Sequence, residues 1–72
     1  MPLTREQSRA GRAMLGWSQG ALAQAAGLGK QTVVDFERGA RTPHMSNLHA
    51  IQRALEAAGI EFLPDNGLRL RR

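Results

Sequence analysis

The sequence contains no cysteine and only three aromatic residues, Trp17, Phe36 and Phe62. The lack of cysteine excludes disulfide bridges and thiolate metal sites, and it makes the cytoplasm the expected compartment. With so few aromatic side chains, the core must consist mainly of alanine, leucine, isoleucine, valine and methionine. Alanine and leucine favour helices, and β-branched residues are few, so the composition predicts a mostly helical chain.

Long apolar runs and the usual signs of catalysis are also missing. No segment approaches the roughly 20 apolar residues of a membrane-spanning helix, and Arg5 and Glu6 are not followed by the apolar stretch of a secretory signal. No nucleophile stands beside a base, and no glycine-rich phosphate loop follows a strand, so an enzyme is not expected. His44 and His49 have a poor spacing for metal ligands. We therefore expect neither a membrane partner nor a metal or cofactor.

The size and charge of the chain set two further expectations. A single domain of 72 residues buries only about 60% of its unfolded surface, which makes a monomer marginally stable and a dimer a reasonable expectation. Ten lysines and arginines against six aspartates and glutamates give a net charge of +4. A basic surface on so small a body favours polyanionic partners, although a soluble protein that is merely basic is the alternative.

The first predicted helix covers 5–15. Thr4 and Gln7 have the spacing of a capping box, in which each side chain bonds the backbone of the other residue. Gly11 lies inside this helix at a cost of about 1 kcal/mol relative to alanine, and we assign it no role. The residues predicted to face the core are Ala10, Ala13 and Met14, with Ser8 as a further candidate.

Three more helices are predicted over 19–26, from about 30 to 39, and from about 45 to 58. Ser18 is a suitable N-cap for the first of them, and Pro43 disfavours helix at Thr42 between the other two. The residues predicted to face the core are Leu22, Ala23, Ala26, Val33, Phe36, Glu37 through its stem, Leu48, Ile51, Ala54 and Leu55.

The last part of the chain changes its period. Residues 60–63 and 68–71 alternate like strands, and the segment 64–67, Pro-Asp-Asn-Gly, is a strong turn signal. Two strands alone are marginal in water. The predicted hairpin must therefore pack on the helices or pair with a second copy of the chain.

The second and third predicted helices have the spacing of a helix-turn-helix unit. Counted from Gln19 as the first position, Ala23 is fifth, Gly27 ninth, Val33 fifteenth and Phe36 eighteenth. The fifth residue must be small because the helices cross over it, and the ninth must tolerate a positive φ. The last two must be apolar to hold the helices together.

The segment 17–39, followed by ARTPHMSNLHAIQRAL, resembles the Cro and phage-repressor family of helix-turn-helix proteins, the xenobiotic-response-element type of transcriptional regulator. The resemblance covers about 4–58 and is carried most specifically by Ser18-Gln19, Leu22-Ala23, Gly27-Leu28, Gln31-Thr32-Val33 and Phe36-Glu37-Arg38-Gly39. It implies a mostly α, lambda-repressor-like DNA-binding domain of four to five helices with a short C-terminal β-hairpin or strand. The expected organisation is a DNA-binding domain over 1–59, with the motif at about 18–39, and a hairpin with a basic tail over 60–72.

The resemblance also implies roles for individual residues, with the third helix in the major groove and the second across the DNA backbone. Base contacts are implied for Lys30, Gln31, Thr32, Val34 and Asp35. Backbone contacts are implied for Ser18, Gln19, Gly29, Arg38 and Arg41, and Gln19 also braces the third helix. Arg12 and Glu37 match an internal ion pair between the first and third helices.

The chemistry of these side chains fits the implied roles. Glutamine can bind adenine N6 and N7, lysine can donate to guanine O6 and N7, and arginine suits phosphate. Asp35 is repelled by phosphates unless it accepts from cytosine N4 or is tied back by Arg38, and we expect it to restrict sequence choice more than to add affinity. Gly29 replaces the family's usual hydroxyl residue, and Val34 either touches a thymine methyl or marks a protein-binding surface.

These observations together predict a sequence-specific, double-stranded DNA-binding transcriptional regulator. The expected form is a homodimeric repressor on a pseudo-palindromic site, with the fourth helix and the hairpin at the dimer interface. The alternative is a protein-binding module, an antitoxin or antiactivator that sequesters a partner protein. The cluster Arg69, Arg71 and Arg72 is either a solvated strand face or a second basic contact.

Overall fold

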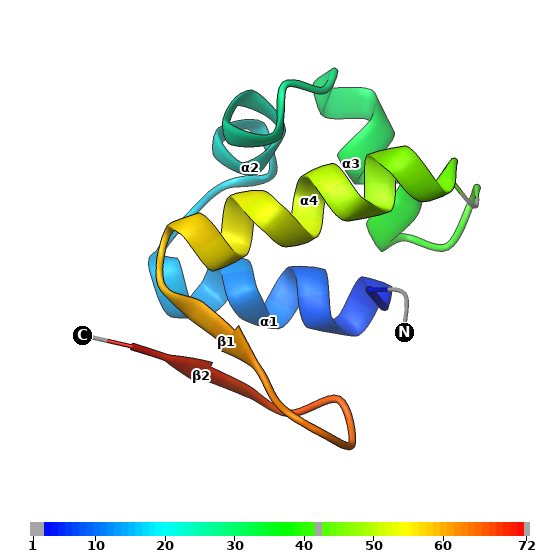
Figure 1. Cartoon of the computed structure of the whole chain (residues 1–72). Helices are drawn as coiled ribbons and strands as arrows, with labels where there is room; N and C mark the ends of the chain where they lie inside the picture. Colours follow the sequence, from blue (N-terminus) through cyan, green and yellow to red (C-terminus); the bar gives the residue numbers. More distant parts are fainter. Residues whose placement is uncertain (1–2, 42, 72) are drawn as a thin grey trace.

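The computed structural model describes residues 3–41 and 43–71. Along this part of the chain run helices α1 (Arg5–Leu15), α2 (Gln19–Ala26), α3 (Lys30–Glu37) and α4 (Met45–Ala57), then strands β1 (Ile60–Phe62) and β2 (Leu68–Leu70) (Figure 1). The predicted mostly helical fold with a C-terminal hairpin is confirmed. The predictions for Thr42 and Arg72 lie outside the described residues.

Local capping explains where the first two helices begin. The hydroxyl of Thr4 accepts from the backbone N–H of Gln7 at 3.1 Å, and the Gln7 side chain accepts from the N–H of Thr4 at 3.0 Å. The hydroxyl of Ser18 accepts from the N–H of Ala21 at 3.0 Å and begins α2. Because these signals involve residues three apart in the sequence, the predicted bounds of α1 and α2 are the observed ones.

The later elements are slightly shorter than predicted. Helix α3 ends at Glu37 rather than at Gly39, since the N–H of Gly39 donates to the Phe36 carbonyl and closes a tighter turn. Helix α4 ends at Ala57, and each strand has three residues instead of four. 

The prediction for the inward face of α1 is wrong. Ala10, Ala13 and Met14 are all exposed, and the buried residues of α1 are Gln7, Ser8 and Gly11. Of the predicted set, only the additional candidate Ser8 is buried. The apolar pattern failed here because α1 packs through polar side chains and one glycine, which hydrophobic periodicity does not detect.

Gly11 has a structural role that was not predicted from the sequence. A Cβ atom at this position would lie 3.2 Å from both terminal methyl carbons of Leu55 on α4. Leu55 is fully buried, so it has little room to move away. The glycine therefore allows α1 to approach α4 closely, and this contact offsets its low helix propensity.

The core lies between the helices and includes the first residue of the hairpin. In Figure 1, α4 runs between the α2–α3 pair and α1. The predicted inward residues of α2, α3 and α4 are buried or packed against the core, as expected. The buried hydrophobic residues are Leu3, Leu22, Ala23, Val33, Phe36, Leu48, Ile51, Leu55 and Ile60. 

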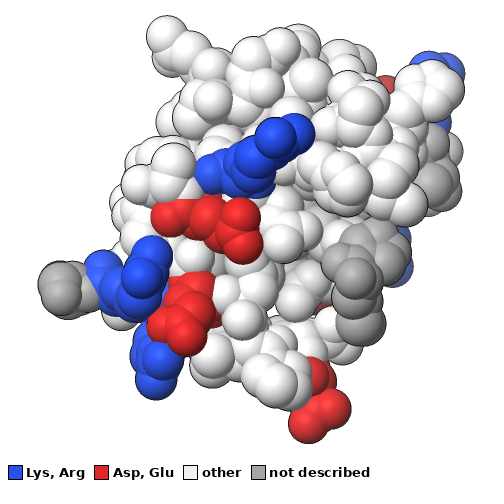
Figure 2. All heavy atoms as spheres, in the orientation of Figure 1, with Lys and Arg blue, Asp and Glu red and all other residues white. Residues whose placement is uncertain are grey.

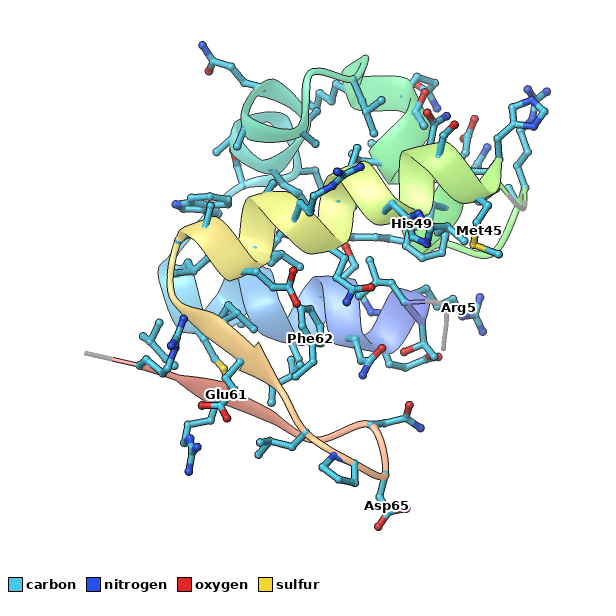
Figure 3. All side chains as sticks on the ribbon, viewed as in Figure 1. Arg5, Met45, His49, Glu61, Phe62 and Asp65 are labelled. Carbon is cyan, nitrogen blue, oxygen red and sulfur yellow. The ribbon has the colours of Figure 1, made fainter. Side chains whose placement is uncertain are left out.

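The hairpin packs on the helices. Its strands are antiparallel with Ile60 opposite Leu70, and Ile60 is buried in the core while Leu70 packs against it. In Figure 3, Phe62 points toward the helices and Glu61 points away from them. Among the described residues, no helix has both the length and the apolar character needed to cross a membrane.

Candidate nucleic-acid interface

The α2–α3 pair has the geometry that its spacing predicts. Ala23 is 2% exposed, so its small side chain fits under the crossing helix, and Val33 is fully buried between the two helices. Gly27 ends α2 with φ 71°, in the left-handed region that glycine adopts at low cost. Leu28 then packs against the core. The residues that follow this turn, Gly29, Lys30 and Gln31, are exposed.

A buried carboxylate fixes the opposite end of α3. The Glu37 side chain is 1% exposed and accepts hydrogen bonds from residues of α1 and α2. Arg12 donates to its Oε1 at 2.7 Å and to its Oε2 at 3.0 Å, Gln19 donates at 3.2 Å, and the Ser8 hydroxyl also donates. The ion pair and the bracing role of Gln19 that the resemblance implied are therefore present. The carboxylate itself is buried, and not only its stem.

Burial and hydrogen bonding act in opposite directions on Glu37. Burial alone would raise the pKa of this carboxyl, but the hydrogen bonds from Arg12, and then those from Ser8 and Gln19, lower it further than burial raises it. The pKa of Glu37 therefore lies below its ordinary value, and the group stays ionised. The charged network joins α1, α2 and α3 and sets the orientation of the helix pair.

Two more arginines of α1 contact the C-terminal end of α3. The Arg9 guanidinium donates to the backbone carbonyl of Glu37, and the Arg5 guanidinium lies against Gly39. Carbonyls at a helix C-terminus lack partners within the helix and carry partial negative charge, which suits a cation. These contacts were not predicted from the sequence, although Arg5, Arg9 and Arg12 recur at helical spacing.

The first six residues of α3, 30–35, include all those for which base contacts were implied. Lys30 and Gln31 are exposed, whereas Thr32, Val34 and Asp35 are half-buried. The Gln31 amide donates to Asp35 at 2.9 Å, and Arg38 donates to the same carboxylate at 3.1 Å. The hydrogen bond from Gln31, followed by the contacts of Arg38, lowers the pKa of Asp35 despite some burial. The Asp35 carboxylate is thus bonded to Arg38 of the same chain. This is one of the two alternatives that the sequence left open for Asp35.

The residues implied to bind the DNA backbone lie at the ends of α2 and α3. The Ser18 hydroxyl caps α2, and the side-chain amide of Gln19 donates one hydrogen bond to Glu37. Gly29 is the N-cap of α3 and has no side chain that could bond the first backbone N–H groups of the helix. These N–H groups can therefore bind an anion. Arg38 and Arg41 are exposed beyond the other end of α3.

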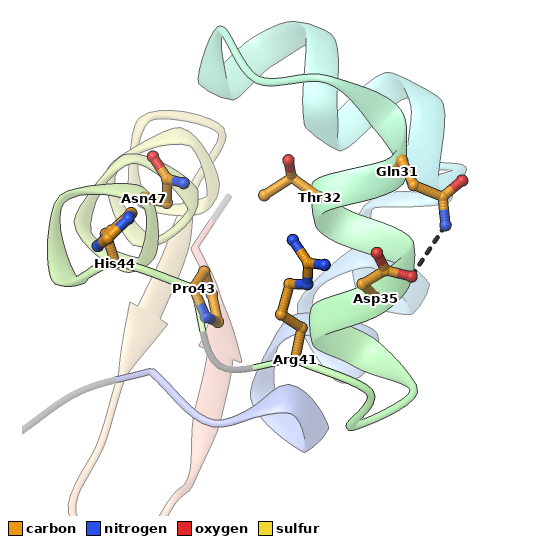
Figure 4. Close-up of a pocket in the computed structure, with 7 residues that line it drawn as sticks. All are labelled: Gln31, Thr32, Asp35, Arg41, Pro43, His44 and Asn47. Atoms are coloured by element: carbon orange, nitrogen blue, oxygen red, sulfur yellow. Dashed lines mark hydrogen bonds between the residues drawn. The ribbon is translucent and has the colours of Figure 1, made fainter.

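A hollow of about 550 Å³ separates α3 from the start of α4 (Figure 4). Thr32 and Asn47 point into it from opposite sides, and the Arg41 side chain extends along it. Its lining consists of Gln31, Thr32, Asp35, Arg41, Pro43, His44 and Asn47. Asn47 was not predicted from the sequence, because only the folded chain shows that the first turn of α4 lies beside α3.

The face that carries α4 and the hairpin differs from this polar hollow. Figure 2 shows acidic and basic side chains side by side on it. Arg69 is paired with Glu61 at 2.8 Å, and both Arg69 and Arg71 are exposed. Opposite charges that lie together attract a polyanion only weakly, so this face is a poorer candidate for DNA than the α3 surface.

Comparison with known proteins agrees with this geometry. A protein-family model described as helix-turn-helix matches residues 9–62, which is more than half of the chain. No curated protein matches the sequence. The matched range includes α2, the turn at Gly27 and the exposed face of α3. The chain belongs to the Cro and phage-repressor family of helix-turn-helix proteins and is a DNA-binding regulator.

Proposed function

We propose that the chain binds pseudo-palindromic double-stranded DNA as a dimer and represses transcription, with α3 in the major groove. The observation that carries the proposal is that the two ends of α3 have different environments. Its C-terminal end is held by the buried Glu37, and its N-terminal end presents exposed Lys30 and Gln31 to solvent. A helix that is held rigidly at one end and exposes polar side chains at the other is suited to hydrogen bonding with base edges in the major groove.

The proposed base contacts use side chains with different hydrogen-bonding capacity. Lys30 donates to guanine O6 or N7, and Gln31 both donates to and accepts from adenine. Thr32 faces the hollow beside α4 (Figure 4). There it would lie next to the DNA strand at the edge of the major groove. Val34 supplies an apolar contact to a thymine methyl group. 

The proposed backbone contacts surround these residues. The open N–H groups after Gly29 and the side chains of Ser18 and Gln19 approach one phosphate strand, and Arg38 and Arg41 approach the other. Asn47 and His44 add donors from the start of α4. Such contacts fix the position of the protein on DNA and carry no sequence information by themselves.

The proposed dimer interface combines α4 with the hairpin segment 60–72. Phe62, Leu68 and Leu70 are only partly buried in the single chain, and Met45 at the start of α4 is 53% exposed. Pairing of two copies through this face would cover these side chains and place the two α3 helices in successive major grooves, about 34 Å apart.

Selection of bound sites from a pool of random duplexes tests the proposal. Enrichment of a two-fold symmetric sequence is expected. The substitution Gln31→Ala should then cost about 1–3 kcal/mol and relax one base position, whereas Arg41→Ala should weaken binding to all sequences alike. Affinity should also fall steeply with salt, with a slope of about −0.9 for each phosphate contact.

Two results would contradict the proposal. Equal losses for the two variants on selected and random duplexes would show that Gln31 does not read a base. Weak duplex binding with a shallow salt dependence would favour the alternative function, in which the chain sequesters a partner protein.

A further inference from the structure

Asp35 lies at the centre of a hydrogen-bonded chain on the exposed face of α3. Its Oδ1 atom accepts from the amide of Gln31 at 2.9 Å and from Nε and Nη2 of Arg38 at 3.3 and 3.1 Å. All of these bonds end on the same oxygen. In the part of the chain that the structure describes, no donor bonds the second oxygen, Oδ2. Figure 4 shows this oxygen on the side of α3 that faces Thr32 and Arg41.

We propose, building on the proposed DNA-binding function, that Asp35 is the specificity-determining residue of α3 and selects a base that presents an exocyclic amino group in the major groove. The amino group is cytosine N4 or adenine N6, and Oδ2 accepts its hydrogen. An ionised carboxylate has only acceptors. Guanine O6 and N7 and thymine O4 are acceptors as well, so these atoms would repel it.

The carboxylate cannot avoid the base by turning away. Its side chain is 18% exposed, and bonds to Gln31 on one side and Arg38 on the other hold it in place. These same bonds lower the pKa of Asp35, so the group does not escape repulsion by taking up a proton. The two alternatives considered from the sequence are therefore compatible, because Arg38 holds one oxygen and the other remains available to a base.

The bond to Asp35 also prepares Gln31 for adenine. Because the carboxylate only accepts, the NH₂ end of the Gln31 amide must face it. This arrangement uses one N–H and leaves the carbonyl oxygen and the second N–H for adenine N6 and N7. The geometry thus favours an adenine opposite Gln31 and a neighbouring amino-bearing base opposite Asp35.

The test compares two substitutions that remove the same charge. Asp35→Asn replaces one acceptor by a donor, whereas Glu6→Gln changes a carboxylate on α1, outside the proposed DNA and dimer contacts, whose side chain is 64% exposed. Glutamine has nearly the same helix propensity as glutamate, so α1 should tolerate it. The wild-type chain and both variants each select sites from the same random duplex pool, and thermal melts confirm that the variants fold.

The wild-type chain should enrich adenine or cytosine at one position, by about tenfold to a hundredfold over guanine and thymine. Asp35→Asn should lose this preference at that position alone, and Glu6→Gln should keep it. A second measurement uses only the wild-type chain. Replacing the selected base by nebularine or 2-pyrimidinone, which lack only the amino group, should weaken binding by about the same factor.

The possible failures are distinguishable. If both variants tighten binding to all duplexes equally and no preference changes, Asp35 acts only as a charge and the inference is wrong while the proposed function stands. If the amino-free bases bind as well as the selected bases, the inference is wrong in the same way. If the wild-type chain enriches no sequence, the proposed function fails and the inference fails with it.

Discussion

Replacing Arg12 by methionine would remove the cation that faces the buried Glu37 and keep most of the apolar stem. Arg12 supplies the hydrogen bonds at 2.7 and 3.0 Å, and the Glu37 side chain is only 1% exposed. Removal of one partner from a buried ion pair costs about 3–5 kcal/mol, because the other charge is left without compensation. Ser8 and Gln19 still donate to Glu37, and Arg12 itself is 18% exposed, so we expect about 3 kcal/mol, the lower end of this range.

A loss of this size is large for a small domain. It corresponds to a fall in Tm of about 12–24 °C, since each kcal/mol shifts the Tm of a 60–100-residue domain by about 4–8 °C. Thermal and urea denaturation followed by circular dichroism would measure it. The matched control is Arg69→Met, which breaks the exposed pair with Glu61 at 2.8 Å and should cost less than about 1 kcal/mol. Equal losses for Arg12→Met and Arg69→Met would refute the reasoning.

The pH dependence gives a second readout of the same substitution. In the wild-type chain the pKa of Glu37 is lowered, so its stabilisation is present above the unfolded-state pKa and is lost as the pH falls through the folded-state pKa. Without Arg12, burial should raise the pKa of Glu37 above its ordinary value. The variant should then gain stability as the pH falls from this raised folded-state pKa to the unfolded-state pKa. The difference in free energy of unfolding between the variant and the wild-type chain should therefore narrow at acidic pH. A difference that stays constant between neutral and acidic pH would contradict this assignment.

Three further substitutions test the packing and the turn that position α3. Gly11→Val should lower the free energy of unfolding by about 1–3 kcal/mol in urea titrations, because the added carbon atoms would press on the buried Leu55, and an unchanged midpoint would argue against the close contact. Gly27→Ala should cost about 1–2 kcal/mol because alanine is strained at φ 71°, whereas Gly29→Ala, at φ −69° in the same turn and with open space around it, should be nearly neutral. Similar melting temperatures for these two alanine variants would show that the turn does not depend on the left-handed conformation.

The elements that were predicted well depend on local signals. The bounds of α1 and α2 follow from Thr4, Ser18 and Gly27, whose effects reach only a few residues along the chain. The apolar spacing of α4 was sufficient to predict Leu48, Ile51 and Leu55 in the core because this helix is packed from more than one side.

The features that were missed depend on contacts between distant residues. The buried face of α1 is polar because Ser8 and Arg12 bond a carboxylate more than twenty positions away, and no periodicity in α1 reveals that partner. Asn47 joins the hollow beside α3 only through the way in which α4 packs. The Gln31–Asp35 bond, by contrast, has the i, i+4 spacing of neighbours on a helix surface and was accessible from the sequence.

The central claim is that the exposed start of α3 meets DNA, and amide chemical shifts of the ¹⁵N-labelled chain measure this most directly. On titration with a selected duplex, the largest shift changes should fall on Lys30 to Asp35, with smaller ones at Arg41 and Asn47. Changes confined to the hairpin and the end of α4, with the α3 signals unmoved, would contradict the account.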